Sequence, residues 1–152
     1  MSLKKIATKK VITISPEATV QEAAMKMRDH HVGDLVVVKT EGQQSKPVGI
    51  LTDRDIVMST TAFGVVPSSV SVGDIMAPTL AEARTTDSLY HVLNLMKENG
   101  IKRVPLVSSS GVLEGIVSSE DIIAALASDL MDLTKTTERQ YRVETERRKK
   151  IA

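Results

Sequence analysis

The stretch Gly49–Ile56, GILTDRDI, recurs in the second half of the chain as Gly115–Ile122, GIVSSEDI. In both stretches a glycine and two aliphatic residues precede Thr or Ser, and an Asp follows three positions after that hydroxyl residue. Aliphatic runs are typical of a buried strand, and a hydroxyl residue followed by an acid three positions later is typical of a helix start. The repeated stretch therefore predicts a strand that runs directly into a helix, once in each half.

The two halves also match outside this stretch. Apolar residues at i, i+3, i+4 and i+7 form one helical face in each half, at an offset of 69 residues: Val20, Ala23, Ala24 and Met27, then Leu89, Val92, Leu93 and Met96. Thr19 with Glu22 matches a capping box at the first helix, and Gly100 is placed to end the second, which we expect over 88–99. Each half therefore predicts a short strand, helix, strand, turn, strand and helix.

The repeat also predicts the domain organisation. We expect one repeat over residues 1–66, a second over 67–127 and a helical tail over 128–152, with 64–74 as a linker. A unit of about 60 residues is marginally stable alone, because it buries little of its surface. The expected fold is therefore α/β (α+β): two β-α-β-β-α units packed with pseudo-two-fold symmetry, two equivalent clefts between them, and a C-terminal helix.

The composition excludes several classes of protein. Cysteine is absent, which removes disulfides and thiolate chemistry and fits a cytoplasmic protein. Lys and Arg number 20 against 19 Asp and Glu, so the bulk charge does not point to nucleic acid. No apolar run approaches the roughly 20 residues of a membrane span, so no membrane association is expected. With only three aromatic residues, any ligand base must be held by aliphatic side chains and backbone.

The helix start at Thr52 can serve a ligand as well as the fold. Its N–H groups and positive dipole end suit an anion, and the Thr52 hydroxyl can donate to a phosphate. The Asp55 carboxylate, one turn further on, can accept hydrogen bonds from two ribose hydroxyls. A lone pattern of this kind is usually only a cap. Its occurrence at the same place in both halves favours a ligand site.

On these stretches the chain resembles a tandem pair of cystathionine-β-synthase (CBS) domains, also called a Bateman module. The resemblance covers about residues 5–127 and rests on HVGDLVVV (31–38) and GILTDRD (49–55), then on IKRVPLV (101–107) and GIVSSED (115–121). Members of this family catalyse no reaction and bind adenosine-containing ligands, such as AMP, ADP, ATP, S-adenosylmethionine or NAD, between the repeats. The resemblance thus implies a non-enzymatic nucleotide-binding module without catalytic residues or a catalytic cofactor.

The resemblance implies roles for the motif residues. Asp55 and Asp121 would contact ribose, and Thr52 and Ser118 would contact phosphate. Arg54 is a further phosphate candidate, a solvated surface Arg being the alternative. Since aromatic residues are scarce, we expect strand residues to form the wall against adenine, ordinary core packing being the alternative. These wall candidates are Val11, Ile12, Val36 and Pro105.

The two clefts are expected to differ in charge. Lys102 and Arg103 match a basic pair that family members place before the second strand, and they could serve a nucleotide whose ribose lies on Asp55. The first half has Gly33 and Asp34 at the equivalent positions. We therefore expect the two clefts to bind phosphate unequally.

Two other groups of residues carry side chains with metal-binding or acid–base chemistry. His30 and His31 are adjacent, so on a helix their side chains diverge by about 100°, and no metal site is predicted. Asp53 and Asp55 could act as an acid–base pair, but Arg54 between them and their place at a helix start favour cap and ribose roles. No catalytic residue is predicted.

The tail and the expected function leave alternatives open. Residues 116–152 contain no Gly or Pro, so the last helix is expected to continue into the tail, as a solvated helix or as a dimer or docking helix. The expected protein is a homodimeric sensor, in which a bound nucleotide stabilises one arrangement that an unknown effector protein recognises. The alternative is a ligand-free oligomerisation or protein-interaction module.

Overall fold

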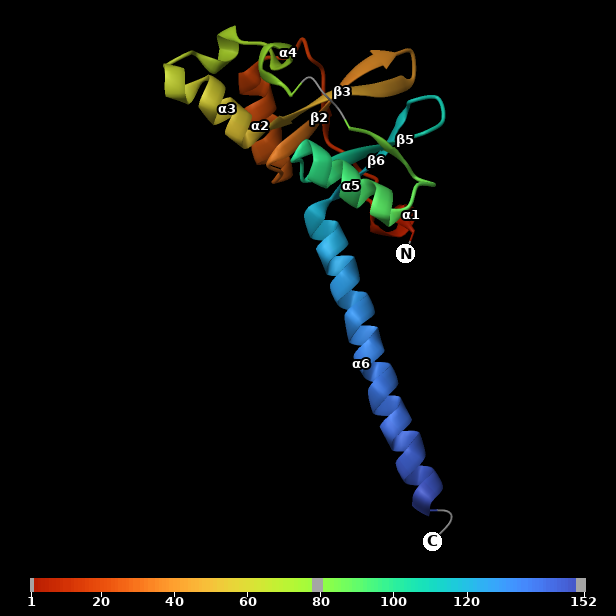
Figure 1. Cartoon of the computed structure of the whole chain (residues 1–152). Coiled ribbons are helices and arrows are strands. Elements are labelled where there is room, and N and C mark those ends of the chain that lie inside the picture. Colours follow the sequence, from red (N-terminus) through yellow and green to blue (C-terminus); the bar gives the residue numbers. More distant parts are fainter. Residues whose placement is uncertain (1, 78–80, 150–152) are drawn as a thin grey trace. The chain divides into compact units, whose positions relative to one another are not determined.

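The computed structural model describes residues 2–77 and 81–149, and the chain divides into two compact units, Met1–Ser118 and Ser119–Ala152 (Figure 1). The elements of the first unit are α1 (Leu3–Ile6), β1 (Thr13–Ile14), α2 (Val20–His30), β2 (Asp34–Glu41), β3 (Gln44–Thr52), α3 (Asp53–Ser59), the 3-10 turns η1 (Thr61–Phe63) and η2 (Pro67–Ser69), α4 (Val72–Ile75), β4 (Ala83–Arg84), α5 (Leu89–Asn99), β5 (Arg103–Val107) and β6 (Leu113–Ser118). The second unit is the helix α6 (Ser119–Lys149).

The first unit contains two three-stranded sheets of the same design. Their strand orders are β1-β2-β3 and β4-β5-β6. In each sheet the short strand pairs in parallel with the middle strand, which pairs antiparallel with its hairpin partner. Both hairpins also have a register shift, between Val37 and Val38 in one and between Leu106 and Val107 in the other. The β-α-β-β-α order predicted for both halves is confirmed.

The predicted helical faces are narrower than their four apolar residues suggest. Val20, Ala23 and Met27 of α2 are buried, as are Val92 and Met96 of α5. The i+4 member of each face is exposed instead, at positions 24 and 93. Each helix therefore rests on its sheet along a narrow stripe.

The stretch 64–74, expected as a linker, contains η2 and the start of α4 and is packed against the first repeat. Val72 is fully buried in the core of the first sheet. The backbone on either side is also bonded to the first repeat: the Val20 N–H donates to Val70 O at 3.0 Å and the Val72 N–H to Ala18 O at 2.8 Å. The Gly, Pro and Ser of this stretch form short turns, while the buried Val72 side chain and the backbone of Val70 and Val72 fix it to the first repeat.

Two short segments at equivalent positions of the repeat each join the sheet of the other repeat. Following α1, Thr8 pairs with Ile116 of β6, with N···O distances of 2.9 and 3.0 Å. Following α4, the Ala77 N–H donates to Ile50 O of β3 at 3.0 Å. The two sheets also contact each other through β3 and β6. Each repeat thus contributes its leading segment, residues 3–8 or residues 72–77, to the sheet of the other repeat.

The repeated glycines make room for these exchanged segments. A Cβ at Gly49 would lie 3.0 Å from Ala77 O, and a Cβ at Gly115 would lie 3.2 Å from Thr8 O. The glycine that opens each repeated stretch therefore permits close approach of another backbone.

The helix α6 confirms the predicted helical continuation beyond the second repeat. It runs unbroken for 31 residues. Leu126, Leu130 and Leu133 lie on it as exposed side chains. Within residues 2–77 and 81–149, no helix combines the length and apolar character needed to cross a bilayer.

Candidate functional site

Thr52 and Asp55 form a complete capping box at the start of α3. Thr52 ends β3, and its Oγ1 accepts a hydrogen bond from the Asp55 N–H at 3.2 Å. In return, Asp55 Oδ2 accepts from the Thr52 N–H at 2.9 Å and from the Thr52 hydroxyl at 2.7 Å. Thr52 can therefore donate to a ligand only by giving up its bond to Asp55. Asp55 Oδ1 takes no part in the box.

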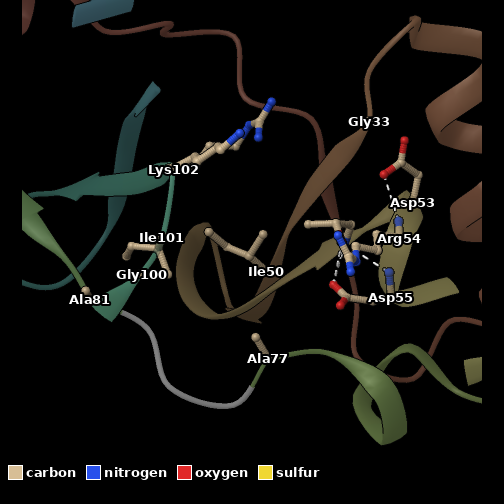
Figure 2. A pocket seen from close by; sticks show the side chains of 12 residues that line it. Gly33, Ile50, Asp53, Arg54, Asp55, Ala77, Ala81, Gly100, Ile101 and Lys102 are labelled. Carbon is tan, nitrogen blue, oxygen red and sulfur yellow. Dashed lines mark hydrogen bonds between the residues drawn. The ribbon is translucent and has the colours of Figure 1, made fainter. Parts of the chain in front are cut away.

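A cavity of about 530 Å³ adjoins this helix start. Its volume lies in the range of about 300–1,000 Å³ that is usual for small-molecule sites. The lining residues come from both repeats: Gly33, Ile50, Thr52, Asp53, Arg54, Asp55, Ala77, Ala81, Gly100, Ile101, Lys102 and Arg103. Figure 2 shows Ile101 and Lys102 on one side, Asp53, Arg54 and Asp55 on the other, and Ile50 between them.

The cavity brings together five of the predicted site residues: Thr52, Arg54, Asp55, Lys102 and Arg103. The predicted residues of the second motif lie elsewhere. Ser118 ends β6, where it pairs with Arg103 in the hairpin register, and Asp121 lies in the first turn of α6. The basic stretch of the second repeat thus shares one cavity with the motif of the first.

The four residues predicted for the adenine wall are not among those that line this cavity. Val36 is 1% exposed in the first sheet, where it pairs with Thr13 and Ile50. Pro105 is buried in the middle of β5. Val11 and Ile12 are partly buried, and Ile12 packs against the first core.

Other apolar residues line the cavity instead: Ile50, Ala77, Ala81 and Ile101. Strand alternation is the signal that could have identified Ile50. Its neighbour Leu51 is fully buried in the core, so Ile50 must point to the opposite face of the sheet. The bridge between Ile50 and Ala77 joins two distant segments and leaves no such signal in the sequence.

An ion pair joins the two repeats beside this cavity. Arg103 Nε lies 2.7 Å from Asp34 Oδ1, and the side chains are 34% and 15% exposed. Partial withdrawal from water makes such a pair stronger than a fully exposed one. The sequence pattern shows that these positions differ in charge but not that they meet.

Gly33 and Asp53 form a second close contact at the cavity. The Asp53 N–H donates to Gly33 O at 2.9 Å. Asp53 Oδ1 accepts from the Arg54 N–H at 2.7 Å, and its Oδ2 would lie 3.2 Å from a Cβ at Gly33. Gly33 thus provides space for the Asp53 carboxylate at the start of α3.

A cavity at the outer end of each sheet carries no predicted site residue. One, of about 620 Å³, lies beside β1 and the far end of β2. Its smaller counterpart beside β4 and β5 has a volume of about 270 Å³ and includes Glu82. Burial raises the pKa of the Glu82 carboxyl above its ordinary value.

The adjacent histidines lie at the end of α2. His30 is its last residue, and His31 caps it in the left-handed conformation. Among the described residues, no group of three or more His, Asp or Glu side chains gathers in a way that could hold a metal ion.

Comparison with known proteins gives a family match on both repeats. Residues 3–60 and 72–128 match the family model described as CBS domain. The uncharacterised protein MK0525 of Methanopyrus kandleri is 36% identical over 123 residues, which are 81% of this chain and 61% of that protein. The chain thus spans less than two thirds of that relative.

Two solved structures have the same fold, and one of them is a complex with ligands. The hexameric CBS-CP12 protein from bloom-forming cyanobacteria is 32% identical, with a TM-score of 0.70 over 81% of this chain and 69% of that one. The CBS domain pair of protein MJ0100, in complex with 5′-methylthioadenosine and S-adenosyl-L-methionine, is 29% identical, with a TM-score of 0.72 over 83% of this chain and 99% of that one.

Proposed function

This chain belongs to the CBS domain family, and from that premise we propose that its cavity binds an adenosine-containing ligand and that the protein is a regulatory module. The observation that carries the proposal is the meeting of Thr52 and Asp55 from one repeat with Lys102 and Arg103 from the other in a single cavity. The ligand complex of the MJ0100 domain pair supports the adenosine class.

The proposal gives each side of the cavity a part of the ligand. Asp55 Oδ1 accepts from a ribose hydroxyl, because Oδ2 is already bonded to Thr52. Ile50 and Ile101 hold the base by apolar contact, in place of aromatic stacking. Lys102 and Arg54, both exposed, approach the 5′ substituent. For the second motif, contact of Ser118 with phosphate and of Asp121 with ribose remains a prediction.

The proposed role is binding without catalysis. The hydroxyl and carboxylate of the motif are bonded to each other in a helix cap, and the roles proposed for them are hydrogen bonds to ligand oxygens. The ligand would act through linkage, by stabilising one arrangement of the repeats or of two protomers for an effector protein. Its effect is limited to its difference in affinity for the two arrangements.

The direct test is a titration with adenosine, AMP, ADP, ATP, S-adenosylmethionine and NAD, read by calorimetry and by the melting temperature. At least one compound should bind, and Asp55→Asn should weaken that binding about tenfold or more. The matched control is Asp74→Asn, because Asp74 closes a capping box of the same kind with Ser71 on α4. Equal affinities of the two variants would refute the ribose role of Asp55.

A second candidate function is a ligand-free oligomerisation module, and one observation favours it. Four apolar side chains within residues 57–66 are 51–78% exposed: Val57, Met58, Phe63 and Val66. An exposed apolar group of this kind is typical of a protein interface. The hexameric state of the CBS-CP12 protein is a precedent for assembly in this family.

Light scattering coupled to size-exclusion chromatography separates the two candidates. As an oligomerisation module, the protein should form dimers that Phe63→Ser weakens and that no adenosine compound changes. As the proposed sensor, it should show an oligomeric state or a melting temperature that depends on ligand. A monomer at all concentrations would exclude the second candidate.

A further inference from the structure

We infer that Asp34 sets the ligand class of the cavity, so that an adenosine ligand with at most one phosphate is favoured over a di- or triphosphate. This inference rests on the proposed function and makes its ligand more specific. It assigns Asp34 a role in specificity through another residue, Arg103, rather than through direct contact.

The geometry engages Arg103 within the protein. Its Nε lies 2.7 Å from Asp34 Oδ1, and Asp34 is the less exposed partner, at 15%. A charge pair withdrawn from water is screened less than a surface pair, so the carboxylate offsets much of the guanidinium field at short range. A phosphate that approaches Arg103 must therefore compete with Asp34.

The charged side chains around the cavity provide no net positive charge to attract a polyphosphate. Two acids, Asp53 and Asp55, and three bases, Arg54, Lys102 and Arg103, line it. The Asp34 carboxylate beside them makes the acids and bases equal in number. Each further phosphate adds negative charge to a ligand, and this balanced set offers no excess positive charge to receive it.

Because of its position, Asp34 can affect the binding of phosphate groups without affecting the affinity for the nucleoside. Asp34 lies at the start of β2, and it is not among the residues that line the cavity, whereas Arg103 is. Removing its charge should therefore change the binding of phosphate groups while leaving base and ribose contacts as they are. A purely structural ion pair would instead alter the binding of all ligands to the same degree.

The test compares wild type with Asp34→Asn by calorimetry, using adenosine, AMP, ATP and inorganic tripolyphosphate. We expect Asp34→Asn to strengthen ATP and tripolyphosphate binding about tenfold, to strengthen AMP binding less, and to leave adenosine binding unchanged. The matched control is Glu41→Gln, which makes the same charge change at the opposite end of β2, where Glu41 pairs with Lys46. It should change none of these affinities.

The outcomes separate this inference from the proposed function. Equal changes for adenosine and ATP, or no change for ATP and tripolyphosphate, would overturn the role of Asp34 while leaving adenosine binding intact. If wild type binds no adenosine compound, the proposed function fails, and the tripolyphosphate titration still decides whether Asp34 limits anion binding. Circular dichroism checks the fold, and Asp34→Ser replaces Asp34→Asn if the latter does not fold.

Discussion

Arg103 Nε lies 2.7 Å from Asp34 Oδ1, and these two residues occupy the same position in the two repeats, 69 residues apart. Two positions that are equivalent in the two repeats are therefore in contact with each other. Two basic residues there would repel, so a basic residue in one repeat is compatible with an acid in the other. This contact gives a physical reason for the departure of the first repeat from the basic pair of the second.

The ion pair should contribute measurable coupling to stability. In a double-mutant cycle of Asp34→Ala and Arg103→Ala, followed by urea unfolding, we expect a coupling free energy of about 1 kcal/mol, because both side chains are partly withdrawn from water. Asp34→Arg should destabilise the protein more than Asp34→Ala, since it opposes two cations. The exchanged pair, Asp34→Arg with Arg103→Asp, should recover much of that loss. Strictly additive effects would show that the contact does not contribute.

The two glycines that open the repeated stretches should differ in their tolerance of a methyl group. A Cβ at Gly49 would meet Met76 Sδ and Cγ as well as Ala77 O, at 2.5, 3.1 and 3.0 Å. At Gly115 the nearest atom, Thr8 O, lies at 3.2 Å. Gly49→Ala should therefore lower the unfolding free energy by about 1–3 kcal/mol, and Gly115→Ala by less than about 1 kcal/mol. Denaturant melts measure both, and the reverse order would contradict the exchanged-segment packing.

Replacement of His31 by glycine should stabilise the protein. It caps α2 at φ 54°, a left-handed conformation that the second repeat gives to Gly100 at φ 63°. Since a side chain disfavours this region, His31→Gly should stabilise the protein by about 0.5–1 kcal/mol. His30→Gly, one position earlier within the helix, should destabilise it by a similar amount. A loss of stability in His31→Gly would indicate that its imidazole makes a contact that outweighs the backbone cost.

Acid should weaken the cap of α2. Hydrogen bonds from the Thr19 N–H and hydroxyl, at 2.7 and 2.8 Å, lower the pKa of Glu22 below its ordinary value of 4.5. Glu22 therefore contributes stability that is present above pH 4.5 and is lost as the pH falls through its lower folded pKa.

The measurement is the melting temperature of wild type and Glu22→Gln across about pH 7 to pH 3. The advantage of wild type should be constant at neutral pH and shrink on acidification. Glu41→Gln, in the β2–β3 hairpin, controls for the general effect of removing a carboxylate. An advantage that stays the same at the acidic end would rule out the cap as its source.

The fold was largely predictable because its signals are local and occur twice. The capping residues Thr19 and Thr52 and the terminating Gly100 act over a few residues, and each predicted the helix boundary at which the structure has it. Ala24 and Leu93 fitted the helical spacing equally well but are exposed. Whether a face is three or four residues wide depends on the sheet beneath it, which the spacing does not encode.

The parts of the candidate site that could be predicted to lie together are those that are contiguous in sequence. Thr52 and Asp55 stand in one stretch, and the Lys102–Arg103 pair in another, and the cavity contains both. The wall candidate Val36 lies in an apolar strand and is 1% exposed, but it is not among the residues that line the cavity. Contacts such as that of Asp34 with Arg103 depend on how the repeats pack, so no spacing within either repeat reveals them.

The exchange of leading segments bears on how such a chain could have arisen. The segment at 3–8 completes the sheet that contains Ile116, and the segment at 72–77 completes the sheet that contains Ile50. In a single ancestral copy with this packing, the leading segment would not complete its own sheet. Such a copy would have needed a second identical chain with which to exchange leading segments. Joining two copies in one chain would make this swap intramolecular and would allow equivalent positions to differ in charge, as Asp34 and Arg103 do.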